Sequence, residues 1–174
     1  MRHVRRGGRY LRAADPNWTD PLSPGHARRR GGRWNPPGSF GVVCLNASVA
    51  LARTQVRHKL EARGVRPEDL VPSQGPVLVH THVPEDYYLD AISDAGLVEV
   101  GLPTTYPLDE SGEPISHDRC QPIGRRAWDS GEPGIACRSA AQVGGVSSSG
   151  EEFAFFARRR LRIDAVEAYG DWYW

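Results

Sequence analysis

The sequence is poor in cysteine, which excludes a small protein held together by disulfides or by a metal bound to cysteines. Its 174 residues include only Cys44, Cys120 and Cys137, an odd and scattered set. Such a set fits neither a disulfide framework nor the spacing of metal ligands. Cys44 and Cys137 lie in apolar runs, so we expect both to be buried, reduced thiols.

Long apolar runs and a large net charge are also missing. No stretch approaches the ~20 apolar residues of a membrane-spanning helix, and no apolar segment of a signal peptide follows the basic N-terminus. We therefore expect a soluble, cytoplasmic protein. A net charge of +1 creates no global field toward nucleic acid or membrane, although the basic residues are almost all arginine.

Glycine and proline are abundant, with 19 and 14 residues, and they predict many loops. The apolar run 41–45 predicts a buried strand, and a helix should follow from an N-cap at Ser48 to about Ala62. Strands and helices are interspersed without regular βαβ spacing, so we expect one α+β domain over residues 1–174. Further strands are expected at 10–13, 76–83, 134–141, 152–156 and within 161–173, and a helix at 118–130. Irregular structure with one short helix near 89–95 is expected at 84–116, and a flexible loop at 144–150.

The Arg-Gly-Gly segments and a pair of histidines could each have either a functional or a purely structural role. Arg-Gly-Gly-Arg occurs at 6–9, overlapping the end of a basic arm at 1–8, and again at 30–33. Such segments can bind single-stranded nucleic acid, so an Arg-Gly-Gly interaction module remains an alternative. His80 and His82 share one face of a predicted strand, but no third ligand accompanies them, so we expect solvent-facing histidines and no metal.

The loop Gly31–Gly38 (GGRWNPPG) is the most informative stretch. Its glycines free the backbone, whereas Pro36 and Pro37 fix their own φ and extend the residue before them. A rigid loop can hold Arg33 in one place, and a guanidinium offers a planar fork of donors that suits phosphate. The alternative is a surface loop whose Trp34 fills a local core.

This loop, the strand and helix after it, and the late segment Gly134–Ala140 (GIACRSA) together resemble the RES domain family. The resemblance covers about residues 9–157 and leaves a C-terminal extension at 158–174. It implies a mixed α/β fold like that of ADP-ribosyltransferase toxins, built around a cleft between sheets. It also implies a toxin that degrades NAD⁺ by phosphorolysis or hydrolysis, with NAD⁺ as substrate rather than cofactor, and an Xre-like antitoxin as protein partner.

The resemblance also implies site residues. The family arginine and serine fall on Arg33 and Ser139, and the family glutamate falls on Gln55 or, in another alignment, on Arg53. A family tyrosine falls on Cys44. The residues expected to contact NAD⁺ are Arg33, Trp34, Asn35, Cys44 and Arg138, and those expected to be catalytic are Arg33, Gln55 and Ser139.

Neither Gln55 nor Arg53 is an acid, and the chemistry explains why this matters. Cleavage of the ribosyl–nicotinamide bond passes through an oxocarbenium-like state, which a nearby carboxylate stabilises. The sequence therefore leaves open an active enzyme with another acid or an impaired binder of NAD⁺ or ADP-ribose compounds. In the first case Gln55→Glu should add little, and in the second it should raise cleavage about tenfold or more. The acceptor (water, phosphate or protein) stays open.

Overall fold

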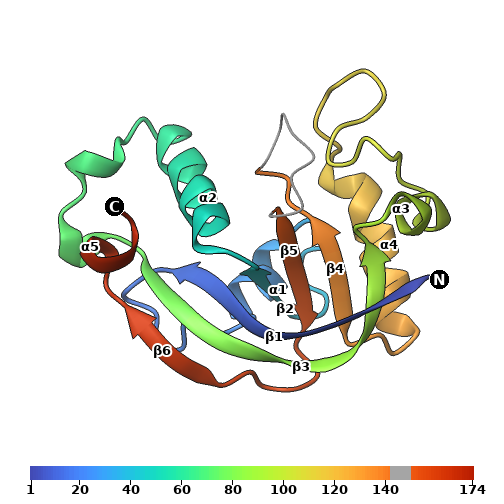
Figure 1. Ribbon diagram of the computed structural model, residues 1–174, viewed down its shortest axis with the longest axis horizontal. Coiled ribbons are helices and arrows are strands. Elements are labelled where there is room, and N and C mark those ends of the chain that lie inside the picture. Colours follow the sequence, from blue (N-terminus) through green and yellow to red (C-terminus); the bar gives the residue numbers. More distant parts are fainter. Residues whose placement is uncertain (142–149) are drawn as a thin grey trace.

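The computed structural model describes residues 1–141 and 150–174, and its elements form one α+β domain (Figure 1). The predicted loop at 144–150 lies, apart from Gly150, outside the described residues. Within the described part, the strands are β1 (His3–Ala14), β2 (Val42–Asn46), β3 (Val77–Ala91), β4 (Gly134–Arg138), β5 (Glu151–Phe156) and β6 (Ile163–Glu167). The helices are α1 (Gly25–Arg30), α2 (Val49–Glu61), α3 (Asp94–Val100), α4 (His117–Asp129) and α5 (Tyr169–Trp172), with 3₁₀ turns at Pro67–Asp69 and Pro72–Gln74.

The sheet curls back on itself. Its strand order is β1-β2-β5-β4-β3-β6, and β1 pairs in addition with β3 from His3↔Leu89 to Ala14↔Val77. The two long strands run side by side across the molecule (Figure 1). The β3–β4 pair is parallel and the other pairs are antiparallel. The expected mixed α+β domain is thus confirmed, but as one curled sheet in place of a cleft between sheets.

Alternation along the strands divides the apolar side chains among three cores. Phe153 and Phe155 point into the curl of the sheet with Tyr10, Leu45 and Tyr88. Ala154 and Phe156 point to the opposite face, where they meet residues of α3 and α4. A third core forms where α2 and α5 pack on β1 and β3, through Leu11, Ala52, Val56, Leu78 and Trp172.

The helix α2 follows its prediction closely. Ser48 has extended backbone, and its side chain accepts a hydrogen bond from the Leu51 N–H at 3.2 Å. This satisfies one of the donors that the first helical turn leaves free. The buried side of the helix carries Leu51, Ala52 and Val56, so α2 is held by its cap and by one apolar face.

Three sequence expectations need correction. Residues 3–8 belong to β1 and do not form a free arm. The first Arg-Gly-Gly segment is therefore paired with β3, and a Cβ at Gly7 would lie 2.6 Å from the Glu85 Cα. Region 84–116 is more regular than expected, because β3 continues to Ala91 and the short helix expected near 89–95 begins only at Asp94, as α3.

His80 is buried, whereas His82 is exposed. The Nδ1 of His80 accepts a hydrogen bond from Arg9 Nε at 3.0 Å, and its Nε2 faces Glu167. Strand β6 pairs with β3 only from Leu78 to Thr81, so it covers the first histidine and ends before the second. In the described residues no group of three or more His, Cys, Asp or Glu side chains could hold a metal ion, and no helix is long and apolar enough to cross a membrane.

Candidate functional site

The loop that carries Arg33 is held from inside. Its two ends use glycines in the left-handed region, Gly31 at φ 76° and Gly38 at φ 70°, a conformation that other residues adopt only under strain. The side-chain amide of Asn35 donates to the carbonyl oxygens of Ala27 at 2.8 Å and Phe40 at 3.2 Å. These bonds tie the loop to α1 before it and to the residues just ahead of β2 after it.

Helix α4 supports the same loop from one side. Gln121 Nε2 donates to the Gly32 carbonyl oxygen at 3.0 Å. One turn further, Gly124 lets the helix pack directly on the backbone of Trp34. Arg33 itself donates from Nη1 to the Ile115 carbonyl oxygen at 3.0 Å, just before α4 begins. The guanidinium is thus oriented through one nitrogen.

The other half of the site lies on the outer face of β2, β5 and β4. Glu152 stands opposite Asn46 on one neighbouring strand and Cys137 on the other. Ser139, just after β4, donates from Oγ to Glu152 Oε1, and Gln55 on α2 donates from Nε2 to the same oxygen at 2.7 Å. In Figure 1, α2 and α4 rise on either side of this part of the sheet. One carboxylate oxygen of β5 therefore accepts hydrogen bonds from side chains of two other segments.

The charge of Glu152 acts on the guanidinium of Arg33. Burial alone would lower the pKa of Arg33, but its neighbours Tyr106, Cys120 and Glu152 outweigh burial and raise the pKa. Of these neighbours only Glu152 is a carboxylate. The positive charge also acts on His117, whose pKa is lowered first by burial and next by Arg33. We call Arg33, Gln55, Ser139 and Glu152 the carboxylate cluster.

The sequence matches the RES domain family over residues 8–174. The chain belongs to the RES domain family. The NAD(+) phosphorylase MbcT of Mycobacterium tuberculosis, strain H37Rv, is 31% identical to it over 136 residues, which are 76% of this chain and 68% of the relative. The MbcT of Mycobacterium bovis gives the same values.

A solved structure agrees with this membership. The crystal structure of the M. tuberculosis MbcT–MbcA toxin–antitoxin complex contains a chain with a TM-score of 0.77 to this one. The alignment covers 98% of this chain and 91% of the other at 21% identity. At that identity the likeness concerns the fold. This RES domain protein therefore shares its architecture with a toxin crystallised in complex with an antitoxin.

Two of the residues expected to touch NAD⁺ have structural positions in this RES domain. Trp34 is 2% exposed and belongs to the core beside Tyr106, and Asn35 is 1% exposed with its amide used inside the loop. The physical reason is the tight loop itself, which turns these two side chains inward while it leaves Arg33 half-buried. The alternative considered for Trp34, a plug in a local core, describes its position.

Arg138 and Arg53 form hydrogen bonds outside the carboxylate cluster. Arg138 donates to the carbonyl oxygens of Ile92 at 2.7 Å and Thr104 at 2.6 Å and pairs with Asp94 at 2.6 Å. It thereby joins the end of β4 to α3. Arg53 donates from Nε to the Trp172 carbonyl oxygen at 2.9 Å. Of the two candidates for the family glutamate position, only Gln55 contacts the carboxylate cluster.

The cysteines differ from expectation at one position. Cys44 is exposed, while Cys120 and Cys137 are buried. Cys44 pairs with Ala154 on the outer face of the sheet, whereas Cys137, on the same face, packs with residues of α4. The surrounding protein nevertheless raises the pKa of the Cys44 thiol by desolvation, and Glu152 adds to this. A thiol of raised pKa is a poor nucleophile, so we assign Cys44 no chemical step.

Glu152 is the residue that inspection of the sequence missed. The sequence predicts only that it begins an apolar strand. A signal was present, because a Glu-Glu pair opens a buried strand and alternation must send its two members to opposite faces. Glu151 faces the interior, where it binds Tyr10 at 2.7 Å and Arg6 at 2.9 Å. Glu152 must then face the outer side.

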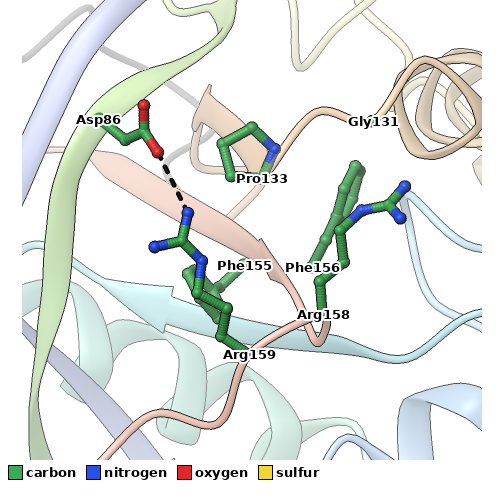
Figure 2. Close-up of a pocket in the computed structure, with 7 residues that line it drawn as sticks. All are labelled: Asp86, Gly131, Pro133, Phe155, Phe156, Arg158 and Arg159. Atoms are coloured by element: carbon green, nitrogen blue, oxygen red, sulfur yellow. Dashed lines mark hydrogen bonds and ion pairs between the residues drawn. The ribbon is translucent and has the colours of Figure 1, made fainter.

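A cavity of about 280 Å³ lies elsewhere on the molecule, at the far end of β5. Figure 2 shows two of its lining residues, Arg159 and Asp86, paired beside Pro133, and the ion pair measures 3.3 Å. Arg158, which also lines it, stacks over the Trp128 ring at 3.8 Å. None of the carboxylate cluster lines this cavity, so it is separate from the candidate site.

Proposed function

We propose that this RES domain protein binds NAD⁺ and cleaves the bond between ribose and nicotinamide. The observation that carries the proposal is the carboxylate cluster, in which Gln55 and Ser139 donate to one carboxylate and the charge of that carboxylate acts on Arg33. The similarity to a protein named NAD(+) phosphorylase supports the same substrate. Arg33 holds the pyrophosphate, because its guanidinium is rigidly presented and matches phosphate geometry.

The reaction is a substitution at the anomeric carbon. The C1′–N bond breaks and its electron pair neutralises the pyridinium, so nicotinamide leaves without needing a proton. An oxygen of phosphate or water forms the new C1′–O bond, and water loses a proton to solvent. The ribose carries positive charge midway through this exchange. Negative charge placed beside the ribose therefore accelerates the step.

The uncharged side chain at Gln55 favours a second candidate function, binding of NAD⁺ or an ADP-ribose compound without turnover. Purified protein incubated with NAD⁺, with and without phosphate, separates the two functions by the release of nicotinamide. We expect release, with ADP-ribose 1-phosphate formed when phosphate is the acceptor, and a loss of release in Arg33→Ala and Ser139→Ala. Binding without release would establish the second function, and the absence of both would overturn the proposal.

We also propose that the protein acts as a toxin held in check by a protein antitoxin. The support is the fold shared with a chain crystallised in a toxin–antitoxin complex. Induced expression of the wild type should then stop bacterial growth, whereas the Arg33→Ala variant at equal level should not. Equal growth of the two strains would contradict the toxin activity.

A further inference from the structure

Glu152 has the position and the bonding of a working carboxylate. Its side chain is half-buried on the outer face of the sheet. Both Ser139 and Gln55 donate to Oε1, whereas no residue within 1–141 and 150–174 donates a hydrogen bond to Oε2. The only guanidinium of the cluster, Arg33, acts on it through charge and forms no ion pair with it. Among the described residues, one oxygen is thus fixed by two donors and the other accepts no hydrogen bond.

We propose that Glu152, on strand β5, is the catalytic carboxylate of this protein and replaces the acid that the family carries at the helix position occupied by Gln55. The inference rests on the proposed NAD⁺ cleavage. The negative charge has moved from the helix to the strand that it faces, across a hydrogen bond of 2.7 Å. Gln55 is a positioning residue, because it orients the carboxylate without supplying charge.

The amide of Gln55 suits the carboxylate of Glu152 as a hydrogen-bond partner. An amide at position 55 can donate to Glu152, but a carboxylate there would place two like charges within hydrogen-bond distance. Like charges at that distance repel, and the pKa of one carboxyl of such a pair is raised. The uncharged residue at position 55 therefore avoids repulsion between like charges beside Glu152, and the missing family glutamate no longer implies an impaired enzyme.

Glu152 acts on the reacting ribose. As the C1′–N bond breaks, its electron pair goes to nicotinamide and positive charge grows on the ribose. The carboxylate stabilises that charge, and Oε2 accepts a hydrogen bond from a ribose hydroxyl. Because this charge is small in bound NAD⁺ and large in the transition state, its loss lowers kcat much more than it weakens binding. Removal of one such electrostatic contribution costs about 10²–10³ in rate.

The test moves the carboxylate from position 152 to position 55. Nicotinamide release and NAD⁺ affinity are measured for the wild type, Glu152→Gln, Gln55→Glu and the double variant. Glu152→Gln should lower kcat by about 10²–10³ with little change in NAD⁺ affinity or melting temperature. The double variant, which restores one carboxylate at position 55, should exceed Glu152→Gln at least ~10-fold. Gln55→Glu alone should not exceed the wild type, and its pH profile should gain an ionisation.

Glu151→Gln is the matched control, because it removes the neighbouring charge on the opposite face of the same strand. It should keep the wild-type kcat. If Glu152→Gln does not fold, Glu152→Asp withdraws the charge by one methylene group, and its kcat should fall at least ~10-fold.

Each negative result refutes a different claim. A wild type that releases no nicotinamide refutes the proposed function. An active wild type whose folded Glu152 variants keep full kcat refutes the role of Glu152 alone. Two results would refute the claim that Glu152 replaces an acid at position 55. One is a double variant whose kcat does not exceed that of Glu152→Gln, and the other is a Gln55→Glu variant whose kcat exceeds that of the wild type at least ~10-fold.

Discussion

A Cβ atom added to Gly124 of α4 would lie 1.7 Å from the carbonyl oxygen of Trp34. The helix and the loop that carries Arg33 therefore touch backbone to backbone, and Gln121 adds a hydrogen bond to the same loop one turn earlier. Atoms cannot approach that closely, so any side chain here moves the helix or the loop. Gly124 thus determines the position of Arg33 without contacting a ligand.

We predict that Gly124→Ala destabilises the protein and weakens NAD⁺ binding together. Displacement of packed backbone costs about 1–3 kcal/mol, and the moved loop misplaces the guanidinium. Calorimetric unfolding and titration with NAD⁺ measure the two effects. Gly170→Ala is the control, since a Cβ there would meet no atom within 4 Å. Equal melting temperatures for Gly124→Ala and the wild type would contradict the prediction.

The Arg33→Lys variant tests recognition of the pyrophosphate. Lysine keeps the positive charge but loses the planar fork, so we expect NAD⁺ affinity to fall at least ~10-fold, or about 1.4 kcal/mol. The melting temperature should change little. Arg119→Lys, at an exposed position of α4, is the control and should bind NAD⁺ as the wild type does. A folded Arg33→Lys protein with unchanged affinity would remove the assignment.

Arg53→Glu tests the competing alignment of the family glutamate. Arg53 holds the C-terminal segment through the carbonyl oxygens of Trp172 and Trp174. The variant should therefore lose about 1–3 kcal/mol of stability and gain no NAD⁺ cleavage. Arg57→Glu, an exposed change one helical turn later, controls for the added charge. Cleavage at least ~10-fold faster in Arg53→Glu would restore that alignment.

Asp90 predicts a dependence of stability on pH. Burial alone would raise the pKa of this carboxyl, but hydrogen bonds from Ser93 and Ile92 and the charge of Arg2 lower it below 3.8. The unfolded chain therefore binds the proton first as pH falls. This contribution is complete above about pH 4, and it is lost between 3.8 and the lower folded pKa.

Asp90→Asn should be less stable than the wild type at pH 7, by about 1–3 kcal/mol, and the difference should shrink below pH 4. Urea unfolding at several pH values measures it. Asp164→Asn, at an exposed carboxyl, serves for comparison. A stability difference that stays constant from pH 7 to pH 2.5 would show that the charge of Asp90 is irrelevant.

Local patterns were sufficient for several elements of this protein. The capped helix after Ser48, the strand at 42–46, the helix at 117–129 and the strand at 151–156 lie where apolar periodicity and capping predicted them. The α+β class and the family followed from the same stretches and from the Gly31–Gly38 loop. These features depend on residues close in the chain, so composition and spacing reveal them.

Tertiary structure decided what depends on distant residues. The curl of the sheet results from the pairing of β1 with β3, which converts the expected basic arm into a strand. The burial of His80 and the exposure of Cys44 depend on whether another element covers that face.

The acid of the site belongs to this second group. Gln55 and Glu152 are 97 residues apart, and neither shows in the sequence that it faces the other. Side-chain alternation could assign Glu152 to one face of its strand, but only the packing of α2 beside β5 brought the two together. A charge can therefore leave its family position without leaving the site, since electrostatic stabilisation depends on distance in space and not on distance along the chain.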